Sequence, residues 1–438
     1  MNKNRLICII GAILLCYMGW TNKFPLLTPS SGHFINTGFT KEIPWAGNLM
    51  YGLFAVHASW ASSLWLVIFF QAAILSVVIC LFYKYFFNSD RFVLWALGFM
   101  VVVTAFTTVS ASVSTLAPPV FIGIALLCGG IILFAKQMLR RDFIVVAAIF
   151  TFSCAMDPSY IMSMLIVSLL FLVYGFVKYK AGIRIIKGAS LVLVFTVISW
   201  LMIASFHYLA GGRFSAVSNC QTAILPGLIR SGQFKDLVEA YPCKVKDLEV
   251  DSLLIGPLAF KDSLLTDEVK GYLEASVLLM TAERDFDTRF YGALYQNALK
   301  ESVALQPDEQ IALNDSIATL KSVFTYYNHE VRDVFMSRQI FKVMDIQSWG
   351  FSQMLMVLLG LISGIVLIFN RKKSKSRGFM VYLFVSWMVT AFCSTYFYGA
   401  AGLQVHLAWL WVLPLFFYIR DSSFVQKQLN EIKAFLNL

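Results

Sequence analysis

The sequence predicts an all-α polytopic membrane protein with one mostly helical extracytoplasmic domain, and three observations lead to that prediction. Apolar residues make up 58% of the 438 positions and charged residues only 14%, whereas soluble domains carry about a quarter charged residues. Apolar runs long enough to cross about 30 Å of hydrocarbon recur along the chain. A single long polar segment, 210–348, interrupts these runs.

Ten runs qualify as transmembrane helices in windows of about 20 residues. The first run follows Lys3 and Arg5, as in a signal peptide, but no small-residue cleavage site comes after it, so we expect a retained helix. The fifth run is short and stops at Asp157–Pro158, so the fifth and sixth runs form either two spans or a re-entrant hairpin. The expected spans are 6–21, 62–83, 92–110, 118–136, 143–157, 160–177, 188–209, 350–370, 378–398 and 403–419.

The orientation follows from the Lys and Arg residues of the short connections. One alternating set of connections holds 19 of the 35 basic residues, and the opposite set holds only Lys23 and Lys41. Because basic connections stay in the cytoplasm, both termini are expected there. The net charge of +10 is mostly this inner collar beside anionic headgroups. Membrane lipids are therefore expected partners, nucleic acid is not, and the expected location is the bacterial inner membrane.

The long polar segment is expected to form a small periplasmic domain. It holds 19 of the chain's 25 Asp and Glu residues, and its length is enough for a core of its own. Apolar residues at helical spacing follow Asp267, and a second helix is expected after Pro307. The expected regions are 1–209 with helices one to seven and the outer loop 22–61, the periplasmic domain 210–348, and 349–438 with helices eight to ten and a cytoplasmic tail.

The cysteines fit this topology. Six of the eight lie in expected spans, where a free cysteine behaves as a small apolar residue. Cys220 and Cys243 alone lie in the polar segment, in a compartment that permits disulfides. We predict that these two residues are bonded.

The sequence contains no motif that is typical of metal binding or nucleotide binding. The sequence contains no GxxxxGK[ST], GxGxxG, HExxH or CxxC pattern, and its five histidines are scattered. No metal site is expected. Any chemistry must therefore use a substrate that is already activated.

The loop from Thr28 to Asn48 is too polar for hydrocarbon and too rich in Gly and Pro for a long helix. It is expected to lie along the outer membrane surface, with one short helix near Gly32 to Gly38, as one wall of a cavity. Ionisable groups near membrane depth indicate a site by default. The opposite wall is expected from Asp157, His207 and Arg213, although Asp157 before Pro158 fits a helix-end residue equally well. Seven tryptophans are expected as interfacial anchors: Trp20, Trp45, Trp60, Trp65, Trp349, Trp409 and Trp411.

The same region carries a family resemblance. The run "TPxSGxFIxxGF", followed by "IP", "YGLF" and a helix with "SLWLVIFFQ", resembles bacterial membrane proteins related to the GT-C-fold glycosyltransferases. The run "LQVHLAWLWVLPL" from Leu403 is similar to the last helix of that family. The resemblance implies transfer of a sugar from a polyprenyl-phosphate-linked donor to a lipid-linked cell-envelope glycan on the outer face.

The resemblance also implies site residues, and here the sequence departs from the family. An acidic base is expected near Ser30 and near Ala46–Gly47, where this chain is neutral, so Glu42 or His33 would have to supply the base. Relatives carry Arg at the position of His406, and a neutral His cannot clamp a phosphate with two parallel bonds. The substrate-binding residues are expected to be Asp157, His207, Arg213, His406 and Asn48.

Two other functions stay open beside the glycosyltransferase. An O-antigen-type polymerase or ligase would need several outer-loop arginines, and Arg213 and Arg230 are few. A transporter would show an inverted repeat or paired broken helices, which the sequence lacks. A non-catalytic scaffold subunit with protein partners in an envelope assembly would have the same sequence features as a transferase that has lost its reaction.

Overall fold

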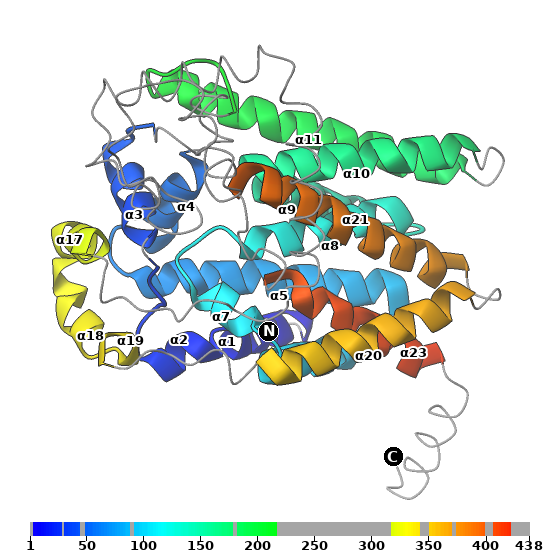
Figure 1. Ribbon diagram of the computed structural model, residues 1–438, viewed down its shortest axis with the longest axis horizontal. Coiled ribbons are helices and arrows are strands. Elements are labelled where there is room, and N and C mark those ends of the chain that lie inside the picture. The colour runs from blue at the N-terminus through cyan, green and yellow to red at the C-terminus, as the bar shows by residue number, and fades with distance from the viewer. Residues whose placement is uncertain are drawn as a thin grey trace, which may run out of the picture.

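The computed structural model describes residues 3–28, 30–43, 49–87, 92–177, 182–216, 317–341, 350–369, 374–398 and 406–421. Every element in these ranges is a helix, apart from one isolated bridge between Leu26 and Thr115. Five helices are long and apolar enough to cross a membrane, and they run along the long axis in Figure 1. The chain is thus a helical multi-pass membrane protein, while ten spans and their direction stay predictions. The five are α5 (Leu64–Phe87), α10 (Pro158–Val177), α11 (Ile183–Leu209), α20 (Gly350–Phe369) and, within α21 (Ser374–Tyr398), the stretch Arg377–Ser394.

Shorter helices fill the space between and beside these five. Each of the other expected spans overlaps at least one of them. The shorter helices are α1 (Lys3–Leu15), α2 (Tyr17–Asn22), α3 (Ser31–Thr40), α4 (Met50–Ser59), α6 (Phe92–Phe106), α7 (Val109–Ser114), α8 (Val120–Phe134), α9 (Arg140–Cys154), α17 (Ile317–Tyr326), α18 (Val331–Phe335), α19 (Arg338–Phe341) and α23 (Val412–Asp421), with 3-10 turns η4 (Asn328–Glu330) and η6 (Ala408–Trp411).

The third expected span, 92–110, is not one helix. It stops at Phe106, and the chain turns into α7, whose six residues are all buried. The Ser110 and Ser114 hydroxyls accept hydrogen bonds from the backbone N–H groups of Met18 (2.8 Å) and Gly19 (2.9 Å) in α2. Irregular backbone at membrane depth is tolerated only where protein groups satisfy it. At the break itself, the Thr108 backbone N–H donates to Gln353 Oε1 of α20 (2.7 Å) and the Val109 N–H donates to the Thr107 hydroxyl (3.3 Å), so the helix can end inside the bundle.

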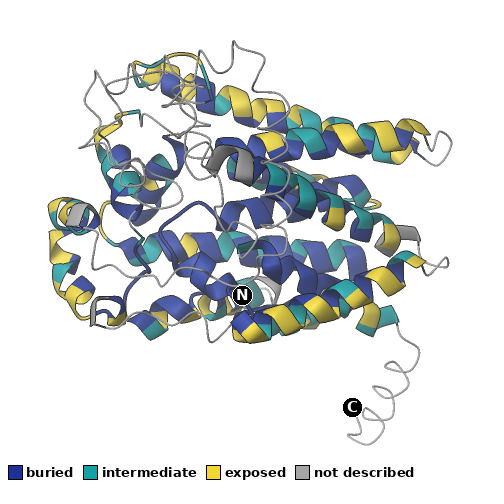
Figure 2. Ribbon diagram, viewed as in Figure 1, coloured by how far each residue is buried: buried dark blue, intermediate teal, exposed yellow. Residues whose placement is uncertain are grey.

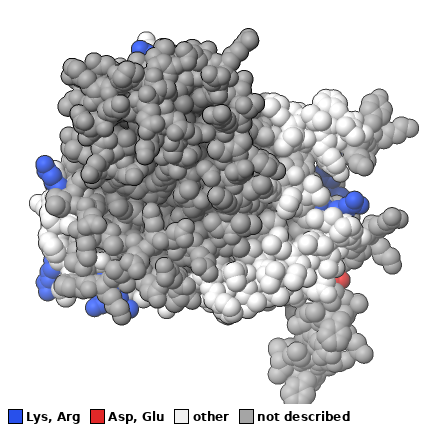
Figure 3. Space-filling model, in the orientation of Figure 1, with Lys and Arg blue, Asp and Glu red and all other residues white. Residues whose placement is uncertain are grey.

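The outer faces of several helices expose apolar side chains, which appear as yellow bands on α10, α11 and α20 in Figure 2. Phe351 and Phe369 on α20, for example, are 72% and 78% exposed. Coloured Lys, Arg, Asp and Glu atoms of the described residues lie toward the two ends of the face in Figure 3. Apolar bands between charged ends are the surface that a lipid bilayer covers.

One end of the bundle, which we call the basic end, gathers the last turns of α5 and α23 with the first turn of α9. Lys84 forms an ion pair with Asp142 at 2.6 Å, and the Tyr85 hydroxyl donates to the same carboxylate at 2.6 Å. Arg420 donates to the Phe86 carbonyl oxygen at 2.7 Å. These basic residues come from connections that the sequence assigned to one side of the membrane, and the structure places them together.

The opposite end, which we call the loop end, carries α3, α4 and the segment 317–341, at the left in Figure 1. The short helix expected near Gly32 to Gly38 is confirmed as α3. A second helix, α4, was not expected there. In the polar segment, the described part of the helix expected after Pro307 is α17, whereas the helix expected from Asp267 lies outside the described residues.

The tryptophans divide into two groups. Trp20 and Trp60 are 60% and 79% exposed, as interfacial anchors should be. Trp409 and Trp411 are buried, so the expectation that they anchor the interface is wrong. Gly123 provides the reason for Trp409, because a side chain at Gly123 would start 2.8 Å from the indole ring. Trp45 and Trp349 lie outside the described residues.

Candidate functional site

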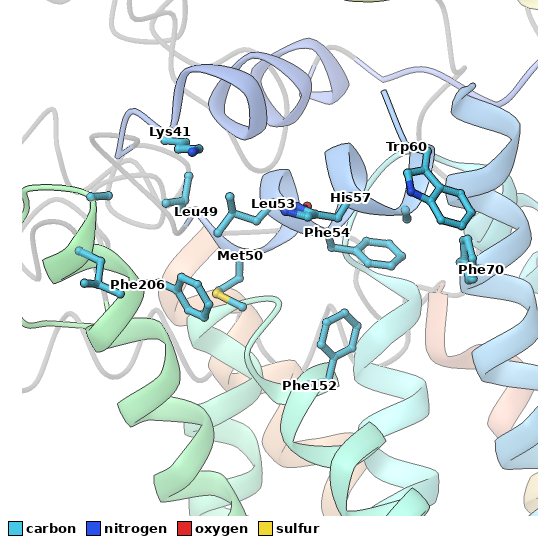
Figure 4. A pocket seen from close by; sticks show the side chains of 13 residues that line it. Lys41, Leu49, Met50, Leu53, Phe54, His57, Trp60, Phe70, Phe152 and Phe206 are labelled. Atoms are coloured by element: carbon cyan, nitrogen blue, oxygen red, sulfur yellow. The ribbon is translucent and has the colours of Figure 1, made fainter. Parts of the chain in front are cut away.

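A cavity of about 750 Å³ lies at the loop end, between α4 and α11, and reaches α5 and α9 (Figure 4). Two of its lining residues, Trp60 and Leu209, are each 79% exposed, so the cavity opens onto the surface. Its size is that of a pocket for a small ligand or part of a lipid. The lining is almost entirely apolar and includes Leu49, Met50, Leu53, Phe54, Ala58, Phe70, Phe152, Phe206 and Ala210.

The wall formed by α4 is held by close contact with α3. A Cβ atom on Gly38 would lie 2.3 Å from the Gly52 carbonyl oxygen, so the two backbones touch at these glycines. The Tyr51 hydroxyl donates to Gln71 Oε1 of α5 at 2.8 Å, inside the core. These contacts fix α4 on two sides and thereby position the residues that it presents to the cavity.

The segment 317–341, which we call the strap, packs across the loop end. The Tyr326 ring stacks on Phe39 of α3, with ring centroids 4.2 Å apart and the planes nearly parallel. Tyr327 is buried, and its hydroxyl bonds the Ser59 hydroxyl at the end of α4 (2.7 Å). The Gln339 side chain accepts from the backbone N–H of Leu27 at 3.0 Å. Part of the predicted periplasmic domain therefore packs on α3 and on the end of α4, although no residue of the strap belongs to the described cavity lining.

Glu330 of the strap meets the start of α5. Its carboxylate accepts hydrogen bonds from the Ser63 hydroxyl (2.6 Å) and the Leu64 backbone N–H (3.2 Å). The first N–H groups of a helix lack partners within the helix, and an acidic group there is stabilising. Burial nonetheless raises the pKa of the Glu330 carboxyl above its ordinary value, and the two hydrogen bonds only partly oppose this.

Lys41 and His57 are the ionisable side chains of the described cavity lining. Lys41 ends α3 in a left-handed conformation and is exposed. The Nδ1 atom of His57 lies 2.7 Å from the carbonyl oxygen of Leu53, one turn earlier in α4. A carbonyl oxygen only accepts hydrogen bonds, so Nδ1 must carry the proton, and in the neutral ring Nε2 holds the lone pair. The sequence did not single out His57, because no local pattern shows that this residue lines a cavity.

The two residues expected as bases are not part of this lining. Glu42 is exposed in the loop after α3, where its backbone N–H donates to Thr40 Oγ1 at 3.2 Å. His33 is half-buried on α3, with its ring beside Phe34 (6.1 Å between centroids). Their catalytic role stays a prediction.

Two expected substrate-binding residues lie near the cavity wall. Nε2 of buried His207 accepts from the Leu49 backbone N–H (3.4 Å), which joins α11 to the start of α4. Arg213 is exposed, three residues after Ala210 of the lining. The glycine before it, Gly212, packs against Ile43 of the loop.

Asp157 and His406 are not part of the described cavity lining. Asp157 caps α10, because its Oδ1 accepts from the Ser159 backbone N–H (2.9 Å) and hydroxyl (2.6 Å), which agrees with a helix-end residue. His406 pairs through Nδ1 with Ser112 of α7 at 2.7 Å. Asn48, Cys220 and Cys243 lie outside the described residues, so the disulfide between the two cysteines stays a prediction.

Across the described ranges, no three His, Cys, Asp or Glu side chains come together as a metal site would need. The cavity can bind an apolar chain, and Lys41 can contact an anionic group of the same ligand. The His57 imidazole can accept a proton. In comparisons with family models, with curated proteins and with solved structures, nothing matched this chain.

Proposed function

We propose that the protein is a GT-C-like membrane glycosyltransferase that acts on a lipid-linked cell-envelope glycan at the outer face of the bacterial inner membrane. The observation that carries the proposal is the apolar cavity at the loop end. A lipid-linked sugar needs an apolar space for its chain at the depth where helices end. Burial of that chain contributes about 25 cal/mol per Å² of apolar surface.

The phosphate of such a donor needs a cation at the rim of the cavity. Lys41 lines the cavity and is exposed, so its ammonium group can meet a phosphate at the surface. Arg213 is a second cation, and it lies just after the end of α11, three residues after the lining residue Ala210. A charge-assisted hydrogen bond to the phosphate is worth roughly 1.5–3 kcal/mol.

Lipid binding tests the proposal first. The purified protein in nanodiscs is titrated with undecaprenyl phosphate, and bound lipid is counted by native mass spectrometry. Leu53→Trp fills the cavity and is expected to weaken binding at least tenfold, whereas Leu169→Trp, on the exposed face of α10, serves as the matched control. Equal binding by both variants and the wild type would place the lipid elsewhere and remove the main support.

A second function, a non-catalytic lipid-binding scaffold of an envelope assembly, is favoured by a different observation. None of the described residues that line the cavity is an Asp or Glu, the residue types that the resemblance implies for the base. Turnover distinguishes the two functions. A wild-type protein that binds undecaprenyl phosphate but releases no sugar from a panel of undecaprenyl-phosphate monosaccharides is a scaffold.

A further inference from the structure

We propose that His57 is the general base of the transfer reaction and that the Leu53 carbonyl oxygen fixes its tautomer. The assignment rests on the proposed function, and it selects a residue that the sequence did not. Its basis is the 2.7 Å contact between Nδ1 of His57 and that carbonyl oxygen, together with the place of His57 in the cavity lining.

The contact determines which nitrogen can take a proton. Nδ1 donates to the carbonyl oxygen, so Nε2 of the neutral ring is the basic atom. In a histidine that acts as a base, a hydrogen bond from the other ring nitrogen sets the tautomer and the orientation of the ring. The Leu53 carbonyl takes the place of the carboxylate that orients histidine in many enzymes.

The position of His57 suits a base that meets an acceptor from outside the membrane. His57 is exposed, whereas Phe54 and Phe152 of the same lining are more enclosed (Figure 4). α4 is held by the Gly38–Gly52 contact and ends at Trp60 in a left-handed turn. The imidazole is thus carried by a fixed helix rather than by a loop.

The other described residues of the lining do not compete for this role. Lys41 is a cation at neutral pH and has no lone pair to offer. The remaining lining side chains are apolar, with Trp60 a donor only. Glu42 and His33 lie outside the lining.

The step is a simple displacement. The acceptor hydroxyl gives its proton to Nε2 of His57 while its oxygen bonds the anomeric carbon of the donor sugar. The bond from that carbon to the phosphate oxygen breaks, and the lipid phosphate leaves with the electron pair. Lys41 offsets the charge that develops on the phosphate, and His57 then returns the proton to water.

The tautomer is tested without any substrate. Nitrogen NMR of the protein with 15N-labelled histidine in nanodiscs, with the His57 signals assigned from their loss in His57→Asn, reports each ring nitrogen. We expect a protonated Nδ1 and an unprotonated Nε2 at neutral pH. The reverse tautomer would overturn the proposal.

Transfer is tested with undecaprenyl-phosphate monosaccharides as donors and lipid-linked glycans extracted from the producing cells as acceptors. We expect His57→Ala to lower kcat at least about 100-fold, as loss of a general base does, with the KM for donor nearly unchanged. Added imidazole should restore part of the rate, which a structural role would not allow.

The outcomes separate the two proposals. A wild type that transfers sugar while His57→Ala keeps more than a tenth of kcat refutes the base and leaves the function standing. The same conclusion follows if the loss appears instead in Glu42→Gln or His33→Ala. A wild type that binds the lipid without transfer refutes the glycosyltransferase, and the base assignment fails with it.

Discussion

The two ends of the helical bundle are held together in different ways. At the basic end, the Lys84–Asp142 ion pair joins residues 58 positions apart and the Arg420–Phe86 hydrogen bond joins residues 334 positions apart, and all four residues lie on helices of the bundle. At the loop end, the contact between Ser63 and Glu330 joins residues 267 positions apart, and that between Leu27 and Gln339 spans 312 positions. At the basic end, these contacts join helices of the bundle directly to one another. At the loop end, they join the bundle to the strap, which belongs to the long polar segment.

One carboxylate from each end, Asp142 and Glu330, shows how the surroundings shift the pKa in opposite directions. Burial alone raises the pKa of Asp142, but hydrogen bonds from Lys84 and Tyr85 outweigh it, so the net pKa is below the ordinary value. Among the described residues, the hydrogen-bond partners of the Glu330 carboxylate are the Ser63 hydroxyl and the Leu64 N–H, and burial keeps its pKa above the ordinary value. The loop end therefore depends on a carboxylate whose charged form is disfavoured by burial. We expect substitutions at the loop end to destabilise the protein more than substitutions at the basic end.

The largest expected effect is at Glu330. Glu330→Ala leaves the half-buried Ser63 hydroxyl and the buried Leu64 N–H without their acceptor, at a cost of roughly 2–4 kcal/mol for the two donors. Release of the strap should be visible as faster trypsin cleavage at exposed Arg332 and Arg338. Cleavage at the wild-type rate would show that the strap is held without this carboxylate.

Gly38→Ala should come next, at about 1–3 kcal/mol, because the new methyl group meets the Gly52 carbonyl oxygen at 2.3 Å. The matched control is Gly98→Ala in α6, where a Cβ meets nothing within 4 Å. The measurement is thermal unfolding followed with a thiol-reactive dye, which reports exposure of buried Cys128 and Cys154. Equal midpoints for the two variants would mean that α3 and α4 are not packed as described.

A smaller effect is expected from pH. Because the folded-state pKa of Glu330 is raised, the folded strap binds this proton more tightly than the unfolded chain does. Its contribution to stability is complete below the ordinary value of 4.5 and declines as the pH rises from there through the folded-state pKa. Strap cleavage by a protease active across this range should therefore be slower at pH 5 than at pH 7. Glu330→Gln should remove that difference, and a variant that keeps it would assign the dependence to another group.

The helices that could be predicted from the sequence are those marked by a continuous stretch of apolar residues. α5, α10 and α20 are continuous apolar stretches and were expected within a few residues of their bounds. The break before α7 was missed because hydropathy counts Thr108 as one polar residue and does not register that Gln353, 245 positions away, accepts from its backbone N–H.

The candidate site was predicted only in part, because contacts between distant positions leave no local pattern in the sequence. The outer loop was expected as one wall, and its residues Lys41 and His57 do line the cavity. The opposite wall was expected from Asp157, His207 and Arg213, whereas the described lining on that side is Phe206, Leu209 and Ala210. The strap was missed because nothing in the local pattern of Tyr327 or Glu330 reveals a partner some 267 positions away. His57 was set aside because its value depends on a cavity that only the folded chain has.

The smallest expected effect is at the basic end, and it completes the comparison. Asp142→Asn removes the charge that pairs with Lys84, whose side chain is 34% exposed against 15% for Asp142. Partly exposed ion pairs contribute about 0–1 kcal/mol, and the asparagine oxygen can still accept from Tyr85. Because the folded-state pKa of Asp142 is lowered, its contribution is present above the unfolded-state value and fades as the pH falls, opposite in sign to that of Glu330. The same thiol-dye assay should show a midpoint within a few degrees of the wild type at neutral pH. A loss as large as that of Glu330→Ala would mean that both ends depend equally on single carboxylates, and that the strap is not what sets the loop end apart.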